Sequence, residues 1–254
     1  MTDFADVLAT VQSRASYFRC ATDAEPGRDG WIGCADLIAD PTLLRGEIDA
    51  TAEGRQSDDA QVLASLFVQS YAFRIPSVAV AAWALGLPAP SVAPDATLMR
   101  ITRHRPGELA IVDRTMREHS AATLVEEVID GHLEPFISAA RAVTKVGRRL
   151  LLGNVAASMA TIFRAMESDG LLGDLRVRDR AEEFFAAAPQ LADLGHWSTI
   201  DVLGASGWFW DRSACCLWYQ TATGSLCDDC SLHDDAERHQ RRRAELVVSA
   251  EAAT

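Results

Sequence analysis

The chain is short of basic residues. Across 254 residues, 24 Lys and Arg stand against 36 Asp and Glu, giving a formal net charge of −12. Phosphate contacts need clustered Lys and Arg, so this balance argues against broad binding to nucleic acids or anionic membrane surfaces. The sequence also lacks a G-x-G-x-x-G segment opening a helix after a strand and a G-x4-G-K-[ST] loop. Neither a dinucleotide site nor a P-loop is therefore indicated.

Targeting segments and long hydrophobic runs are missing as well. The opening residues, MTDFADVLATVQ, include acidic residues and no basic region, so no signal peptide is predicted. The longest uncharged apolar run, residues 75–94, is interrupted by internal prolines and is a poor membrane span. A composition that is 48% hydrophobic and 24% charged is typical of a folded globular chain. We therefore expect a cytoplasmic protein whose thiols are reduced.

Helical periodicity dominates the chain. Apolar residues recur at spacings of three and four over most of the sequence, and acidic or hydroxyl residues precede several of these runs. We expect Pro41 to stop or bend a helix, Ser57 to cap one, Pro76 to break or kink one, and Gly131 to separate two helices. The predicted helices span residues 3–19, 33–44, 58–74, 77–86, 123–129, 133–146, 151–166, 177–187 and 234–250.

One segment alternates instead. Residues 97–102 and 108–112 have the two-residue periodicity of strands, and Arg105-Pro106-Gly107 lies between them as a turn signal. The predicted fold class is thus mainly α with a small β-hairpin. We expect a helical domain over residues 1–195 and a small C-terminal lobe over 196–254, where glycine and tryptophan become frequent.

Four of the six cysteines crowd that lobe. Cys215, Cys216, Cys227 and Cys230 form the spacing C-C-x10-C-x2-C. The C-x2-C half can aim both sulfurs at one metal, whereas adjacent side chains in extended backbone point to opposite faces and do not easily bind a single ion. Structural zinc sites usually combine two C-x2–4-C halves, and a 2Fe–2S rhomb takes four cysteines in all. Spacing alone leaves zinc and iron–sulfur about equally supported, with disulfides less favoured.

The other two cysteines stand apart from this group. Cys20 and Cys34 flank a loop rich in Gly, Pro and charged residues. They could pair or bind a metal, but isolated buried thiols are the commoner case. We expect that simpler role for both.

The residues around the clustered thiols carry a resemblance. A basic residue precedes the paired cysteines, an aromatic pair follows them, and a glycine precedes the C-x2-C half, as RSACCLWY (212–219) and GSLCDDC (224–230) show. These segments resemble the C-terminal signature of the FhuF family of siderophore-iron reductases. A second segment, LLGNVAAS (151–158), is similar to the internal Gly-Asn segment of that family.

The resemblance implies a function and a cofactor. The four cysteines would hold a 2Fe–2S cluster in a cytoplasmic ferric-siderophore reductase, which passes one electron to Fe(III) in a hydroxamate-type siderophore and releases Fe(II). A ferredoxin or flavodoxin system would donate the electron, and peripheral contact with a siderophore importer is compatible with this role. Two alternatives remain open: a 2Fe–2S electron carrier for another enzyme, and a binding module stabilised by a four-cysteine zinc site.

Four further residues are candidates for the substrate site. Trp208 and Trp210 precede the cysteines and could line the surface where a chelate approaches, although they could equally wall a small core. Arg212 supplies positive charge beside the thiols. Asn154 lies on a helix rich in small residues, where it could orient a polar ligand or simply accompany tight helix packing. An arginine run at 238–243 reads as a solvated face or, less simply, as a docking patch for an acidic electron donor.

Overall fold

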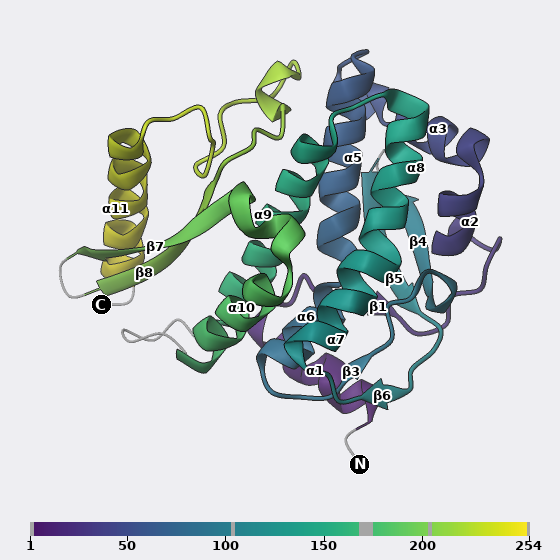
Figure 1. Cartoon of the computed structure of the whole chain (residues 1–254), viewed down its shortest axis with the longest axis horizontal. Coiled ribbons are helices and arrows are strands. Elements are labelled where there is room, and N and C mark those ends of the chain that lie inside the picture. The colour runs from purple at the N-terminus through teal and green to yellow at the C-terminus, as the bar shows by residue number, and fades with distance from the viewer. Residues whose placement is uncertain (1–2, 103–104, 168–174, 203–204, 253–254) are drawn as a thin grey trace.

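A computed structural model describes residues 3–102, 105–167, 175–202 and 205–252 (Figure 1). This part of the chain is mainly helical with small sheets, as predicted. The α-helices are α1 (Phe4–Arg14), α2 (Cys34–Ala39), α3 (Pro41–Asp49), α4 (Ala52–Arg55), α5 (Ala60–Arg74), α6 (Ser77–Ala84), α7 (Ala121–Val125), α8 (Glu134–Thr144), α9 (Arg148–Met166), α10 (Leu175–Ala187) and α11 (Asp235–Ala252). Short 3-10 turns are η1 (Pro94–Ala96), η3 (Pro189–Leu194) and η4 (Trp218–Gln220), and η2 (Glu126–Leu133) is a π-helix.

The strands are short and form three small sheets among the described residues. A four-stranded sheet has the order β1-β5-β4-β2, β3 pairs with β6, and β7 pairs with β8. The strands are β1 (Cys20–Ala21), β2 (Trp31–Gly33), β3 (Ala89–Pro90), β4 (Thr97–Thr102), β5 (Arg105–Ile111), β6 (Met116–Arg117), β7 (Gly195–Val202) and β8 (Ala205–Arg212).

The predicted hairpin exists, but it is not isolated. Strands β4 and β5 pair antiparallel, and residues 103–104 of their connection lie outside the described residues. Strand β2 extends the sheet on the β4 side, and β1 joins β5 in parallel. These added strands are two and three residues long, too short for an alternating pattern to be recognised in the sequence.

Helices α5 and α6 form the centre of the hydrophobic core. The whole of α6 is buried, and α5 packs against α9. No single helix in the described residues is long and apolar enough to cross a membrane. Together α5 and α6 reach the required length and composition, but they are bent by 46° at their junction. Pro76 lies at that junction, where a proline was expected to interrupt the helix.

Several helix boundaries differ from the prediction. Pro41 starts α3 rather than ending a helix, because the first helical position needs no backbone N–H and Asp40 caps the amides that follow. Asp59, not Ser57, caps α5. Helix α1 ends at Arg14, ahead of the predicted residue 19.

The predicted break at Gly131 is wrong. The backbone continues from α7 through η2 into α8 because the wider π-helical turn absorbs the change in periodicity. His132 in η2 is buried; its Nδ1 lies 2.5 Å from the Val92 carbonyl and its Nε2 lies 2.6 Å from the Tyr71 hydroxyl. A carbonyl only accepts, so Nδ1 carries the proton and Nε2 accepts from Tyr71. Burial lowers the pKa of His132 to about 4.

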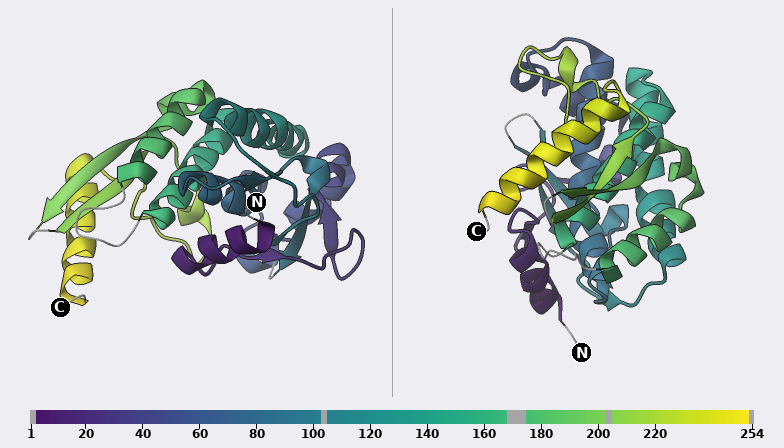
Figure 2. Two further views of the ribbon diagram at one scale, coloured as in Figure 1. Left: turned by 90° about the horizontal axis from the view of Figure 1, so that it is seen from below. Right: turned by 90° about the vertical axis from the view of Figure 1, so that its left-hand side faces the viewer.

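A second hairpin, β7–β8, was not predicted. Its two strands pair antiparallel over their full described length, Gly195–Val202 with Ala205–Arg212. Trp197 stacks on Trp208 with ring centroids 3.5 Å apart, and Trp208 and Trp210 both join the main hydrophobic core. Helix α11 packs on the hairpin, as both views in Figure 2 show, and α9 packs against β8. The C-terminal segment thus shares side-chain packing with the helical part, while the boundary at 195/196 stays a prediction.

Candidate metal centre and adjoining cleft

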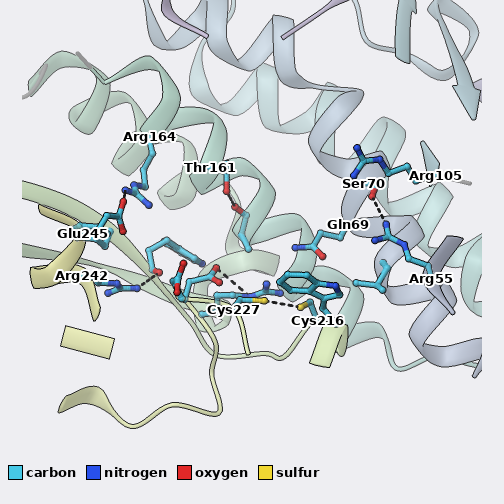
Figure 3. A pocket seen from close by; sticks show the side chains of 18 residues that line it. Arg55, Gln69, Ser70, Arg105, Thr161, Arg164, Cys216, Cys227, Arg242 and Glu245 are labelled. Atoms are coloured by element: carbon cyan, nitrogen blue, oxygen red, sulfur yellow. Dashed lines mark hydrogen bonds and ion pairs between the residues drawn. The ribbon is translucent and has the colours of Figure 1, made fainter. Parts of the chain in front are cut away.

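The connection between β8 and α11 brings the four clustered thiols together. Cys216 Sγ and Cys227 Sγ lie 3.4 Å apart (Figure 3). Cys230 lies close enough to Cys215 to act on its pKa through a side-chain hydrogen bond. Each pair takes one thiol from the C-C half and one from the C-x2-C half. In the described residues, no three or more His, Cys, Asp or Glu side chains converge as ligands of a single ion.

Local backbone geometry explains this pairing. Leu217 adopts a left-handed conformation, with φ of +66°, immediately after the paired cysteines, and its amide donates to Cys215 Sγ at 3.4 Å. The Cys230 amide donates to the Cys227 carbonyl at 3.0 Å, which closes the C-x2-C turn. A Cβ on Gly224 would lie 1.8 Å from the Trp218 carbonyl oxygen, so only glycine fits there.

The thiols within one pair differ in acidity. The pKa of Cys216 is lowered to about 6, first by a hydrogen bond from Cys227 and also by the nearby charge of Arg212. The pKa of Cys227 is raised by the same hydrogen bond and by burial. Burial is also the main cause that raises the pKa of Cys215. The Cys216–Cys227 pair therefore favours one thiolate and one thiol, with the negative charge on Cys216.

A buried polar relay anchors the paired cysteines to α5 and α9. Arg212 Nη2 donates to Asn154 Oδ1 at 2.6 Å, and Asn154 Nδ2 donates to the carbonyl and hydroxyl oxygens of Ser65, both at 2.9 Å. The Ser65 hydroxyl in turn donates to the Cys216 carbonyl at 2.6 Å. Hydrogen bonds buried in this way are costly to break because water cannot replace the lost partner.

Gly153, the neighbour of Asn154, allows the same loop to approach α9. A Cβ on Gly153 would lie 2.4 Å from the Cβ of Ala214, which is far inside van der Waals contact. The Gly-Asn segment and the cysteine block, the two parts of the sequence that resemble the FhuF family, therefore touch in the folded chain. The small residues of α9 allow close packing here, and the hydrogen bonds of the Asn154 side chain go to Arg212 and Ser65.

A cleft of about 560 Å³ opens beside Cys216 and Cys227. Among the predicted substrate residues, Trp210 and Arg212 line it. Trp208 is stacked on Trp197 instead, and Asn154 is fully buried in the relay. Of the four predicted substrate residues, two therefore line the cleft and two are buried in the protein interior.

Sequence reasoning missed much of the cleft lining. Arg55, Ser70 and Arg105 lie together at one end of the cleft, as Figure 3 shows, and come from α4, α5 and β5. Thr161 of α9 also lines the cleft. No motif joins these positions in the sequence, and only the packing of separate elements brings them to one surface.

The arginine run on α11 has mixed roles. Arg242 is 4% exposed, and its guanidinium binds the Asp211 carboxylate at 2.6 Å and the Trp210 carbonyl at 2.8 Å. That side chain fastens α11 to the hairpin, so the solvated-face reading is wrong for Arg242. Arg241 and Arg243 are exposed, as that reading expects.

The two remaining cysteines lie away from the thiol pairs and carry no disulfide. Burial raises the pKa of both Cys20 and Cys34 to about 11. Thiols of this kind stay protonated and unreactive near neutral pH. Both match the expected isolated thiols.

No protein-family model matches this chain, and no curated protein matches it. The thiol pairs, the buried relay and the adjoining cleft are therefore what bears on the function.

Proposed function

We propose that the chain is an iron–sulfur redox protein in which Cys215, Cys216, Cys227 and Cys230 hold a 2Fe–2S cluster. Two thiol pairs suit two metal ions in a rhomb better than one tetrahedral zinc ion, which needs four ligands around one point. In this proposal Cys215 and Cys230 serve one iron, and Cys216 and Cys227 serve the other. The lowered pKa of Cys216 supports it, because ligand thiols must be deprotonated.

Within that class, we propose a ferric-siderophore reductase. The observation that carries this proposal is the cleft of about 560 Å³ directly beside Cys216 and Cys227, which is within the size range of small-molecule sites. A plain electron carrier needs only a docking surface, and a zinc-stapled module needs no cleft at its metal. The hydroxamate-type substrate class comes from the family resemblance.

The reaction needs little from the protein beyond positioning. A bound 2Fe–2S cluster supplies one electron at a time. One electron from a ferredoxin or flavodoxin-type donor, which is itself oxidised by one electron, converts Fe(III) of the chelate to Fe(II), and no bond forms between substrate and protein. Siderophore oxygen donors are hard ligands that fit Fe(II) poorly, so the reduced ion passes to other ligands.

The chain's own residues set the distance and the electrostatics of this transfer. The relay from Arg212 through Asn154 holds the Cys216 backbone at the wall of the cleft. Trp210 and Trp218 line that wall and limit water at the thiols. Asp228 and Asp229 lie between two ligand positions, where their negative charge disfavours an added electron and lowers the reduction potential.

An anaerobic visible spectrum of freshly purified protein, recorded before and after dithionite with iron and zinc counted, tests the proposal. We expect broad visible bands that bleach on reduction and two irons per chain. A ferric hydroxamate added to the reduced protein should then be converted to Fe(II). A colourless protein with one zinc ion would support the zinc-stapled module. A cluster that reduces partner proteins but not ferric chelates would support the electron carrier.

A further inference from the structure

Three arginines gather beside the thiol pairs. Arg55 and Arg105 line the cleft, and Arg105 also lines an adjoining cavity of about 300 Å³ together with Arg74. Figure 3 shows Arg55 and Arg105 on either side of Ser70 at one end of the cleft. Burial and the charge of Arg105 lower the pKa of both Arg55 and Arg74, and Arg19 also lowers that of Arg74, so Arg105 lies close enough to repel both guanidinium groups.

Two of these three arginines donate to neutral partners. Arg55 Nη2 donates to the Ser70 hydroxyl at 3.4 Å, and Arg74 Nη1 donates to the Tyr17 carbonyl at 3.0 Å. In the described part of the chain, no carboxylate lies within 4.0 Å of any of the three guanidinium groups. We call Arg55, Arg74 and Arg105 the arginine triad.

The other arginines of the cleft are compensated. Arg164 lies 3.6 Å from Glu245, and Arg242 binds Asp211 at 2.6 Å. Arg212 lies 3.9 Å from the Asp229 carboxylate. The contrast is informative because the chain as a whole has twelve more acidic than basic residues (36 − 24). Where carboxylates are abundant, an uncompensated cationic triad indicates that its counter-charge comes from a ligand.

We propose that the arginine triad binds the anionic face of the substrate, so that the cleft takes ferric chelates with net negative charge, made of catecholate or carboxylate oxygens, in preference to neutral or cationic hydroxamate complexes. This inference rests on the proposed reductase function and replaces the substrate class that the family resemblance implies. Guanidinium groups match planar oxygen anions and form charge-assisted hydrogen bonds with them. Arg55 and Arg105 line the same cleft as Cys216 and Cys227, so a chelate held there lies next to the thiol pairs.

Gallium complexes separate binding from electron transfer, because Ga(III) has the charge of Fe(III) but is not reduced by the protein. The full chain would be titrated calorimetrically with gallium tris-catecholate, gallium citrate and a neutral gallium trihydroxamate, each at low and high salt. We expect both anionic complexes to bind at least roughly tenfold more tightly than the neutral one. Their affinity should fall as salt rises. The two anionic probes distinguish a catecholate from a carboxylate ligand.

Single substitutions test the triad itself. Arg55→Gln, Arg74→Gln and Arg105→Gln should each weaken binding of the anionic gallium complexes by roughly three- to tenfold and leave the neutral complex unchanged. Arg141→Gln removes the same charge from an exposed position on α8 that does not line the cleft, and it should change neither. Arg105 is exposed, so that variant does not depend on refolding of a buried site.

Three outcomes would overturn the inference. The neutral trihydroxamate could bind as tightly as the anionic complexes, the triad variants could bind like Arg141→Gln, or inorganic phosphate could bind as well as gallium citrate, which would mark a simple anion site. Each of these leaves the reductase proposal standing, because that proposal is decided by the visible spectrum and the reduction assay. Conversely, a colourless protein that still binds the anionic complexes would refute the reductase and keep the triad as a chelate site.

Discussion

Asn154 anchors the loop of residues 213–234, here called the thiol loop because it carries the four clustered cysteines. Its amide accepts from Arg212 and donates twice to Ser65, and all of these groups are buried. A single side chain therefore satisfies partners on two other elements. Removing it takes the acceptor from the buried Arg212 guanidinium and the Asn154 donor from the Ser65 carbonyl and hydroxyl, and the cost is larger than that of one lost contact.

We expect Asn154→Leu, which keeps the side chain's approximate size, to lower the free energy of unfolding by about 2–4 kcal/mol. Urea denaturation measures this directly. Ser158→Ala, one turn further along α9, removes a single hydrogen bond to the Gln69 carbonyl and should cost only about 1 kcal/mol. Equal urea midpoints for Asn154→Leu and the unaltered protein would show that the relay contributes nothing to stability.

Gly153 contributes by having no side chain, which leaves room for Ala214 of the thiol loop. We expect Gly153→Ala to displace the loop at Ala214, lower the free energy of unfolding by about 1–3 kcal/mol and weaken cluster retention. Ala214→Gly in the same chain removes the clashing methyl group and should restore most of that loss, which a double-mutant cycle measures. Gly147→Ala is the matched control, since a Cβ there meets nothing within 4 Å. An additive double mutant would show that the two residues do not share a contact.

At the scale of an element, the π-helix η2 stands out because it carries a buried titratable group. His132 contacts Tyr71 and Val92, and the carboxylate of Glu127 is the nearby charge that favours its protonation. Burial outweighs that charge, so the ring stays neutral in the folded chain well below the pKa of an unfolded histidine.

This difference predicts how stability depends on pH. The pKa of His132 in the folded chain, about 4, lies below the ordinary histidine value of 6.5, so on acidification the unfolded chain takes up a proton before the folded chain does. The contribution of neutral His132 to the free energy of unfolding is fully present above pH 6.5 and is lost as pH falls toward 4. Between pH 7.5 and 5 the loss from this one group should be about 2 kcal/mol. The free energy of unfolding of His132→Gln, measured with urea, should depend less on pH between pH 7.5 and 5. The same pH dependence in this variant and the unaltered protein would contradict this account.

At the scale of the whole molecule, the loop that carries the four clustered thiols has little regular secondary structure of its own. Residues 213–234 contain only one short 3-10 turn, and they connect β8 to α11. The hairpin on one side is tied into the main core by Trp208 and Trp210. The loop itself lacks such support, so metal ligation should contribute much of its order.

We therefore expect Cys227→Ser to lose the visible absorption and to expose residues 213–234 to proteases, because one proposed cluster ligand is removed and Cys216 loses its thiol partner. Cys20→Ser, which alters a thiol outside the pairs, should keep both the colour and the digestion pattern. Limited proteolysis followed by mass spectrometry locates the cuts. Retained colour with an unchanged pattern in Cys227→Ser would argue against ligation by this residue.

The same scale shows what local patterns can and cannot reveal. Helices α5, α6, α10 and α11 were predicted near their observed bounds, because apolar periodicity and capping residues are local features of the sequence. The hairpin β7–β8 escaped prediction, since its glycines and tryptophans lack regular alternation. Pro41 was misread because a proline can either end a helix or begin one, and only its neighbours in space decide.

By itself, the sequence determined the four-thiol motif, the mainly helical class and the candidate redox chemistry, since these depend on residue type and short spacing. Only the tertiary structure decided which thiols pair, that Asn154 hydrogen-bonds Arg212 and Ser65, and that Arg55 and Arg105 line the cleft beside Cys216 while Arg74 lines the adjoining cavity. The physical reason is separation along the chain. Asn154 and Ser65 are 89 positions apart, and contacts of that kind arise from the packing of whole elements, which no local pattern encodes.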